Sequence, residues 1–168
     1  GGDEAANKTV VNFGEIDVQG AEWADGIAAY GDGHALFNHG SIVATGDEAT
    51  GIYAEADDDA EDSQTVEIRN TGTIKAIGGS NAYGIAAHDY TGDDFLIYNG
   101  YGDGEANGEP GSITSTGPHA WGIHVSRFSA PPGVTVTIDH DGAMAVPGTD
   151  PAVGKQLRGY ASVVENRG

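Results

Sequence analysis

Residues 68–87, IRNTGTIKAIGGSNAYGIAA, contain the pattern that decides the fold of this chain. Two short signatures follow one another in this stretch. The first, Asn-x-Gly-x-Ile, begins at Asn70, and the second, Ala-x-Gly-Ile, begins at Ala82. Most of the remaining chain is a loose copy of the same two signatures. Recurrence at a period of roughly 20–50 residues is typical of repeat proteins.

Copies of both signatures can be aligned along the chain. The first signature begins at Asn12, Asn38, Asn70, Asn99 (interrupted by an insertion at 100–110), His140 in a degenerate copy, and Asn166 in a copy cut short at Gly168. The second signature begins at Ala24, Ala49, Ala82, Ala120, and Ala152 in a weak copy with Lys155 in place of Ile. The distance from the first signature to the second is nearly constant, whereas the return segment varies in length. We therefore expect loop insertions at one corner of the repeat.

Each signature alternates between apolar and other residues with a period of two. Ile74 and Ala76 point to one side in the first signature, Ile85 and Ala87 in the second, and glycines bound both. Such segments predict short strands with tight corners. Equivalent strands one repeat apart gain from parallel stacking, whereas an antiparallel sandwich gains nothing from identical residues at a fixed period.

The predicted fold class is therefore all-β, a single right-handed parallel β-helix (β-solenoid) of five to six turns, spaced about 4.8 Å apart. The right hand follows from the usual preference of crossover connections. One domain spans residues 1–168, with an N-terminal segment at 1–8 and repeats at 9–154. Residues 155–168 begin a further turn, which we expect to serve assembly, and the chain is either a complete mature subunit or a piece of a longer protein.

The segments FNHGSIVATGDEATGIYA (37–54) and 68–87 resemble the repeats of bacterial autotransporter passengers and related large surface adhesins. The resemblance covers about residues 9–154 and the last few residues. It implies an exported, right-handed β-helix that serves adhesion or display, and an extracellular location, at the cell surface or secreted. The insertion at 100–110 and the weak fifth copy depart from this pattern. The repeat class carries no fixed catalytic motif to transfer.

Composition narrows the classes of partner. The net charge is −19, with 7 Lys and Arg against 26 Asp and Glu, which disfavours nucleic acid and anionic membranes as partners. No apolar run is long enough to span a membrane, so no membrane insertion is expected. Glycine contributes 28 of the 168 residues, in keeping with many tight corners and close backbone contacts. Cysteine is absent, which excludes disulfides and thiol chemistry.

Calcium is the one cofactor that the sequence suggests, because hard cations need several converging oxygen ligands. The candidate metal ligands are Asp57, Asp58, Asp59 and Asp62 in one corner, with Asp93 and Asp94 in the equivalent corner of the next repeat. Stacking of the two corners would bring the groups together. The alternative is a set of solvated acidic loops, since neither an EF-hand nor a calcium-binding nonapeptide pattern is present.

Two sets of residues are candidates for partner binding. Tyr83 and Trp121 precede their glycines at the same repeat position, and we expect them to stack on one outer face, where they would bind a glycan or another partner, or simply cover a loop. Lys155, Arg158 and Arg167 give residues 155–168 a positive charge on an otherwise acidic chain. A positive end and a negative end favour head-to-tail association of the chain with itself.

The sequence thus predicts a non-enzymatic extracellular structural protein, either the subunit of a head-to-tail β-solenoid filament or a segment of a rod-like surface adhesin. Its partners would be other copies of the chain, and a glycan or a host or cell surface. No catalytic residue is assigned. The alternative is a glycan-binding or polysaccharide-degrading module on the same scaffold, although strand-facing acids such as Asp17 and Asp25 are sparse.

Overall fold

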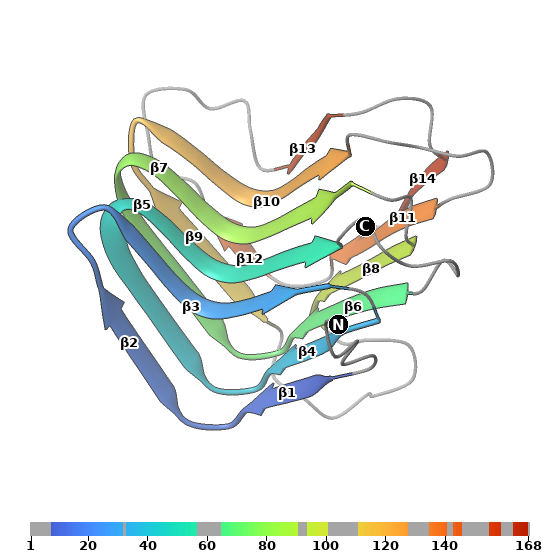
Figure 1. The fold of residues 1–168 in the computed structure, drawn as a ribbon, viewed down its shortest axis with the longest axis horizontal. Coiled ribbons are helices and arrows are strands. Elements are labelled where there is room, and N and C mark those ends of the chain that lie inside the picture. Colours follow the sequence, from blue (N-terminus) through green and yellow to red (C-terminus); the bar gives the residue numbers. More distant parts are fainter. Residues whose placement is uncertain are drawn as a thin grey trace, which may run out of the picture.

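The computed structural model describes residues 8–31, 33–56, 65–90, 94–100, 111–127, 135–140, 143–145, 155–158 and 163–167. Within these ranges every regular element is a β-strand and every strand pairing is parallel (Figure 1). The strands are β1 (Thr9–Asn12), β2 (Glu15–Gln19), β3 (Trp23–Tyr30), β4 (Ala35–Asn38), β5 (Ser41–Ala56), β6 (Thr65–Asn70), β7 (Thr73–Asp89), β8 (Asp94–Asn99), β9 (Ser112–Thr116), β10 (His119–Arg127), β11 (Thr135–His140), β12 (Ala143–Ala145), β13 (Lys155–Arg158) and β14 (Val163–Arg167). The predicted all-β class with parallel strands is confirmed.

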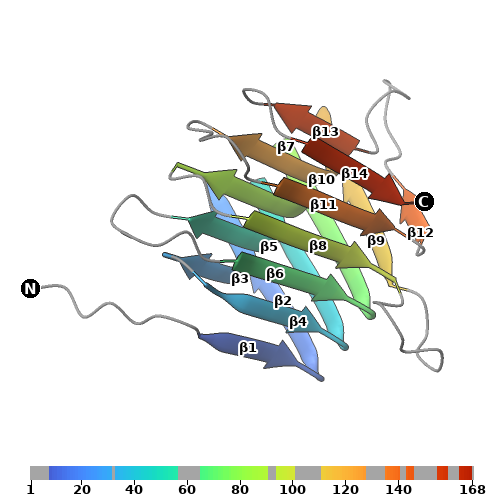
Figure 2. The same ribbon diagram turned by 90° about the vertical axis from the view of Figure 1, so that its right-hand side faces the viewer.

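Two parallel sheets contain these strands. The first has six strands in the order β1-β4-β6-β8-β11-β14, so each strand lies beside its equivalent from the next repeat (Figure 2). The second has eight strands and contains β2, β3, β5, β7, β9, β10, β12 and β13. In Figure 1 the eight-stranded sheet bends, so that β2 and β9 lie on one side and β3 and β10 on another.

In β5 and β7 the bend runs through one continuous strand, which differs from the predicted tight corners, whereas Gly20 separates β2 from β3 and Gly117 separates β9 from β10, as predicted. β5 is 16 residues long and carries Ile42 of the first signature together with the whole second signature, and it passes through Gly46 with only a register shift between Gly46 and Glu48. β7 does the same through Gly78. Parallel pairing between β5 and β7 resumes directly beyond the shift, and this is why the backbone turns without leaving the sheet.

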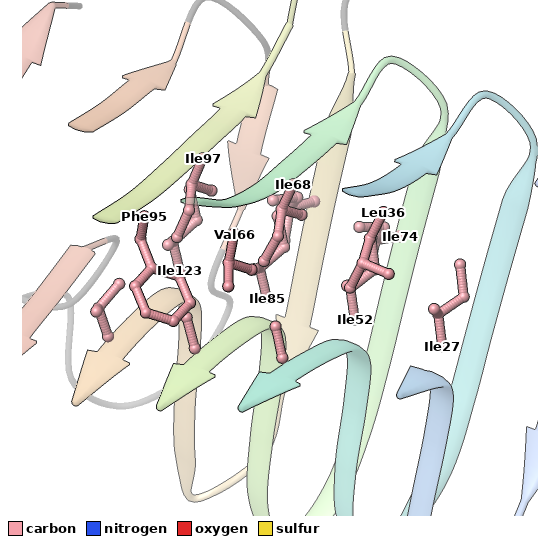
Figure 3. Close-up of a cluster of buried hydrophobic side chains, with 14 of the residues drawn as sticks. Ile27, Leu36, Ile52, Val66, Ile68, Ile74, Ile85, Phe95, Ile97 and Ile123 are labelled. Carbon is pink, nitrogen blue, oxygen red and sulfur yellow. The ribbon is translucent and has the colours of Figure 1, made fainter. Parts of the chain in front are cut away.

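The core consists of columns of equivalent apolar residues. Ile52 and Ile85 are register partners and both are fully buried, as predicted. Side chains from the two sheets meet in one cluster (Figure 3), which includes Leu36, Ile68 and Ile97 from the six-stranded sheet and Ile52, Ile85 and Ile123 from β5, β7 and β10. A second, smaller cluster lies under the bend and consists of Ala24, Ala44, Ala49, Ala76 and Ala82.

Glycine in the second signature is required by the isoleucine of the first. A Cβ added to Gly84 would lie 2.1 Å from Cγ2 of Ile113 and 2.5 Å from the carbonyl oxygen of Gly122. Gly51 has the same relation to Ile74, at 2.2 Å. The isoleucine of one repeat thus occupies the volume that a side chain would need at the glycine of the preceding repeat.

Asparagine in the first signature forms a buried ladder along the six-stranded sheet. The Nδ2 atom of Asn12 donates to Oδ1 of Asn38 (2.8 Å), Asn38 donates to Asn70 (2.8 Å), and Asn70 donates to Asn99 (2.7 Å). His140 lies in register with Asn99 at the next position. The ladder satisfies polar groups that lie beside the apolar columns, where an unmade hydrogen bond is costly.

Candidate functional site

Aromatic side chains gather on the outer side of β3, β5, β7 and β10. Their positions alternate with core residues such as Ala24 and Ile27, which places them on the opposite side of the sheet. We call this surface the aromatic face, and its residues in register are Trp23, Asp25, Ala28 and Tyr30 on β3; Glu48, Thr50, Tyr53 and Glu55 on β5; Asn81, Tyr83, Ala86 and His88 on β7; and His119, Trp121, His124 and Ser126 on β10.

The predicted stack of Tyr83 and Trp121 is confirmed. The two rings lie 4.8 Å apart between centroids and are nearly parallel, with an interplanar angle of 6°. His124 packs against both, at 5.3 Å from Tyr83 and 5.5 Å from Trp121. His119 lies beside Trp121 at 6.2 Å, also stacked. Equivalent residues on neighbouring parallel strands are one strand spacing apart, which is close to the distance between these rings.

The row of rings continues beyond this stack to the edge of the face. His88 lies 6.1 Å from His124 and 5.2 Å from Tyr53, and Tyr53 lies 5.6 Å from Tyr30. Tyr30 and His88 are not among the residues that the sequence predicted for this face. The four residues at this repeat position are of different types, namely Tyr30, Glu55, His88 and Ser126, so a search for a recurring residue type does not find it. Only counting from the glycine of the second signature would have identified the position as outward.

Carboxylates lie among the rings on β3 and β5. The hydroxyl group of Tyr53 donates to Glu55, and burial together with this bond raises the pKa of Tyr53 well above its usual range. Burial also raises the pKa of Asp25; a hydrogen bond with Thr50 opposes this rise and the charge of Glu48 adds to it. The carboxylates thus carry negative charge into a half-buried, aromatic environment.

His88 lies on the inner part of the same face. Burial lowers its pKa from the ordinary 6.5, and the nearby carboxylate of Glu55 opposes this effect. The hydroxyl of Tyr53 lies 3.4 Å from Nδ1 of His88. His124 is almost fully buried, and its Nε2 atom lies 2.7 Å from Oγ of Ser126. The lowered pKa favours the neutral imidazole of His88 near neutral pH, and both imidazoles pack against neighbouring rings of the face.

Most of the predicted calcium ligands, namely Asp57, Asp58, Asp59, Asp62 and Asp93, lie outside the described residues. Asp94 begins β8 and is partly exposed. Among the residues with a described placement, no group of three or more His, Asp or Glu side chains is arranged to hold a metal ion. The calcium site therefore stays a prediction.

The basic residues near the C-terminus take defined register positions. Lys155 lies beside Ile123, which confirms that it stands where the second signature has Ile. Arg158 lies in register with Ser126. Arg167 lies in register with Asp139 of the same chain. The binding of a partner by these residues stays a prediction.

The predicted start of the sixth copy at Asn166 is wrong by two residues. Asn166 lies in register with Ile138, not with His140. The observed register places Val164 beside Val136, which in turn lies beside Phe95 of β8. This register aligns apolar residue types in one column, and the matching of apolar types is the physical reason for the shift, because apolar positions contribute more to stability than one further asparagine position would.

Nothing in the described part of the chain is a helix of the length and hydrophobicity that a membrane span requires. Comparison with protein-family models, with curated proteins and with solved structures yields no match for this chain. The resemblance to autotransporter and adhesin repeats therefore stays a prediction from the sequence.

Proposed function

We propose that the chain is a right-handed parallel β-helix with a non-enzymatic, extracellular structural role, as a subunit of a head-to-tail filament or as a segment of a rod-like surface adhesin. One observation carries the proposal, the stacking of equivalent residues in register over successive repeats. The columns of isoleucine, alanine and asparagine run across the strands of both sheets. Such stacking suits a protein whose task is to extend in one direction.

The first repeat supports association at its end. Among the described strands, β1, β2 and β3 each pair on one side only. Val10 is 37% exposed, whereas its register partner Leu36 is fully buried. A further strand laid on β1 would bury Val10 and pair the backbone of the edge. The acidic residues Glu15 and Asp17 on β2 would attract a basic partner end.

Charge reversal tests the filament form of this proposal. The double variant Lys155→Glu, Arg158→Glu should form shorter fibres or none, and added salt should weaken assembly of the wild type. Lys75→Glu, which changes charge on an exposed mid-sheet position of β7, is the matched control and should assemble normally. Sedimentation velocity and negative-stain images give the readout. A wild-type chain that stays monomeric at high concentration and low salt would refute the filament form of the proposal and leave only the form in which the chain is a segment of an adhesin.

A second function, the binding of a glycan, is favoured by the aromatic face. Exposed Trp and Tyr side chains present flat apolar surfaces with a polar edge, a combination that suits partners with both apolar and hydroxyl groups. Trp23 and Tyr30 are the exposed tryptophan and tyrosine rings of this face. Cleavage of a polysaccharide, which the sequence also left open, stays a prediction without assigned residues.

A further inference from the structure

The aromatic face repeats one local unit, an exposed ring beside a carboxylate. Trp23 is 74% exposed and its register partner is Glu48; Tyr30 is 60% exposed and its register partner is Glu55. Asp25 lies between the two rings on the same strand. Two ring-and-carboxylate pairs on one strand edge would suit a polymer that repeats an apolar ring and a positive charge.

The rings and carboxylates are held in place by their own contacts. Glu55 accepts a hydrogen bond from the hydroxyl group of Tyr53, and the ring of Tyr53 packs against the ring of Tyr30. Thr50 and Ala86, small residues of the same face, are buried among these larger side chains. A surface that is ordered before binding loses little conformational entropy when a ligand arrives.

The charge of the face selects the class of ligand. On β3 and β5 the face carries Asp25, Glu48 and Glu55, and none of the sixteen positions that define it is Lys or Arg. The nearest basic residue in register is Arg158 on β13, at the opposite margin. With a net charge of −19 on the whole chain, sulfated or uronate glycans would be repelled. A cationic ligand gains from both the carboxylates and the ring faces.

We propose that the β3–β5 part of the aromatic face binds a glycan built from glucosamine units with free ammonium groups. The apolar face of a sugar ring packs on Trp23 or Tyr30, and the ammonium group pairs with Glu48 or Glu55. A lysine-rich peptide would supply ammonium groups but no rings to cover the aromatic surfaces. This inference rests on the glycan-binding candidate and is independent of the structural role, since a rod can form whether or not its side binds a sugar.

Titration calorimetry with a β-1,4-linked glucosamine hexamer in mildly acidic buffer tests the proposal. The wild type should bind this hexamer. The N-acetylated hexamer, which lacks the positive charge, should bind with an affinity at least about tenfold lower. The double variants Trp23→Ala, Tyr30→Ala and Glu48→Gln, Glu55→Gln should each weaken binding about tenfold. Phe13→Ala is the matched control, because Phe13 is 78% exposed but lies outside this face.

Retained melting temperature and circular dichroism in each variant would show that the fold is intact. The proposal is overturned if the glucosamine hexamer does not bind the wild type, or if the acetylated hexamer binds equally well. It is also overturned if hexalysine binds as tightly as the sugar, or if Phe13→Ala weakens binding as much as the double variants. Loss of sugar binding with unchanged assembly would separate this site from the structural role.

Discussion

Replacement of Asn70 by Ala should destabilise the protein severely, because this residue is an inner rung of the buried asparagine ladder. Asn70 is fully buried; its Nδ2 atom donates to Asn99 at 2.7 Å and its Oδ1 atom accepts from Asn38 at 2.8 Å. Alanine removes both ladder bonds and leaves a cavity between the neighbouring rungs. The loss is therefore larger than that of two solvent-exposed hydrogen bonds.

The size of the effect follows from the number of bonds and their burial. A buried polar group that loses its partner costs about 1–3 kcal/mol, so two lost bonds give a loss of about 2–6 kcal/mol. Asn12 provides the matched control. It stands at the end of the ladder, makes one ladder bond, to Asn38, and lies closer to solvent. Its replacement by Ala leaves one buried group, Oδ1 of Asn38, without this bond and should cost about 1–3 kcal/mol.

Urea unfolding followed by tryptophan fluorescence measures both variants against the wild type. At about 2–4 °C per kcal/mol for a chain of this size, the melting temperature should fall clearly further for Asn70→Ala than for Asn12→Ala. Equal losses for the two variants, or a loss below about 1 kcal/mol for Asn70→Ala, would refute the buried ladder as a source of stability.

Three further changes test the core, the insertion and the aromatic face. Ile85→Ala should cost about 2–5 kcal/mol in the same urea assay, since Ile85 is fully buried; a loss below half a kcal/mol would contradict the isoleucine column. Deletion of residues 101–110 joins Gly100 to Gly111 and restores the Asn-x-Gly spacing of the other repeats, so the variant should fold with a near-native circular dichroism spectrum; an unfolded product would show that the segment belongs to the core. Because burial lowers the pKa of His88 in the folded state below 6.5, the unfolded chain binds the proton first, and stability should fall as pH drops through about 6.5; melting curves at falling pH should show a smaller loss in His88→Gln than in the wild type, and an equal loss would assign the pH effect to other groups.

The sequence alone predicted the parts of the structure that depend on identical residues at equal spacing. The pairing of Ile52 with Ile85 and the stack of Tyr83 on Trp121 were both confirmed. The position of Lys155 beside Ile123 was confirmed as well. In each case a parallel neighbour one repeat away turns spacing in the chain directly into contact in space, so alignment of the copies is enough.

Contacts between residues at different repeat positions could not be predicted from the alignment of the copies. The row from Tyr30 through Tyr53 to His88 joins different positions of the repeat on three strands, and no alignment of copies indicates that these rings touch. The displaced register of Asn166 has a related cause. The last copy can be aligned with the preceding repeat either by its asparagine or by its two valines. A motif search does not compare the contributions of apolar and hydrogen-bonding positions to stability, and this comparison decides the register.

The close fit between the two signatures explains why a rigid sheet lies under the aromatic face. At each repeat the isoleucine of the first signature fills the space over the glycine of the second, with Ile113 over Gly84 and Ile74 over Gly51. Neither residue can change alone without a clash or a cavity, so the stacking register of the strands is defined every time the pair recurs. Because Tyr83 directly precedes Gly84, the same fit fixes the height at which the outward ring meets its neighbour on β10. The spacing of surface rings is thus inherited from the core, and a substitution such as Gly84→Ala should disturb the Tyr83–Trp121 stack, visible as changed tryptophan fluorescence, even though it touches neither ring.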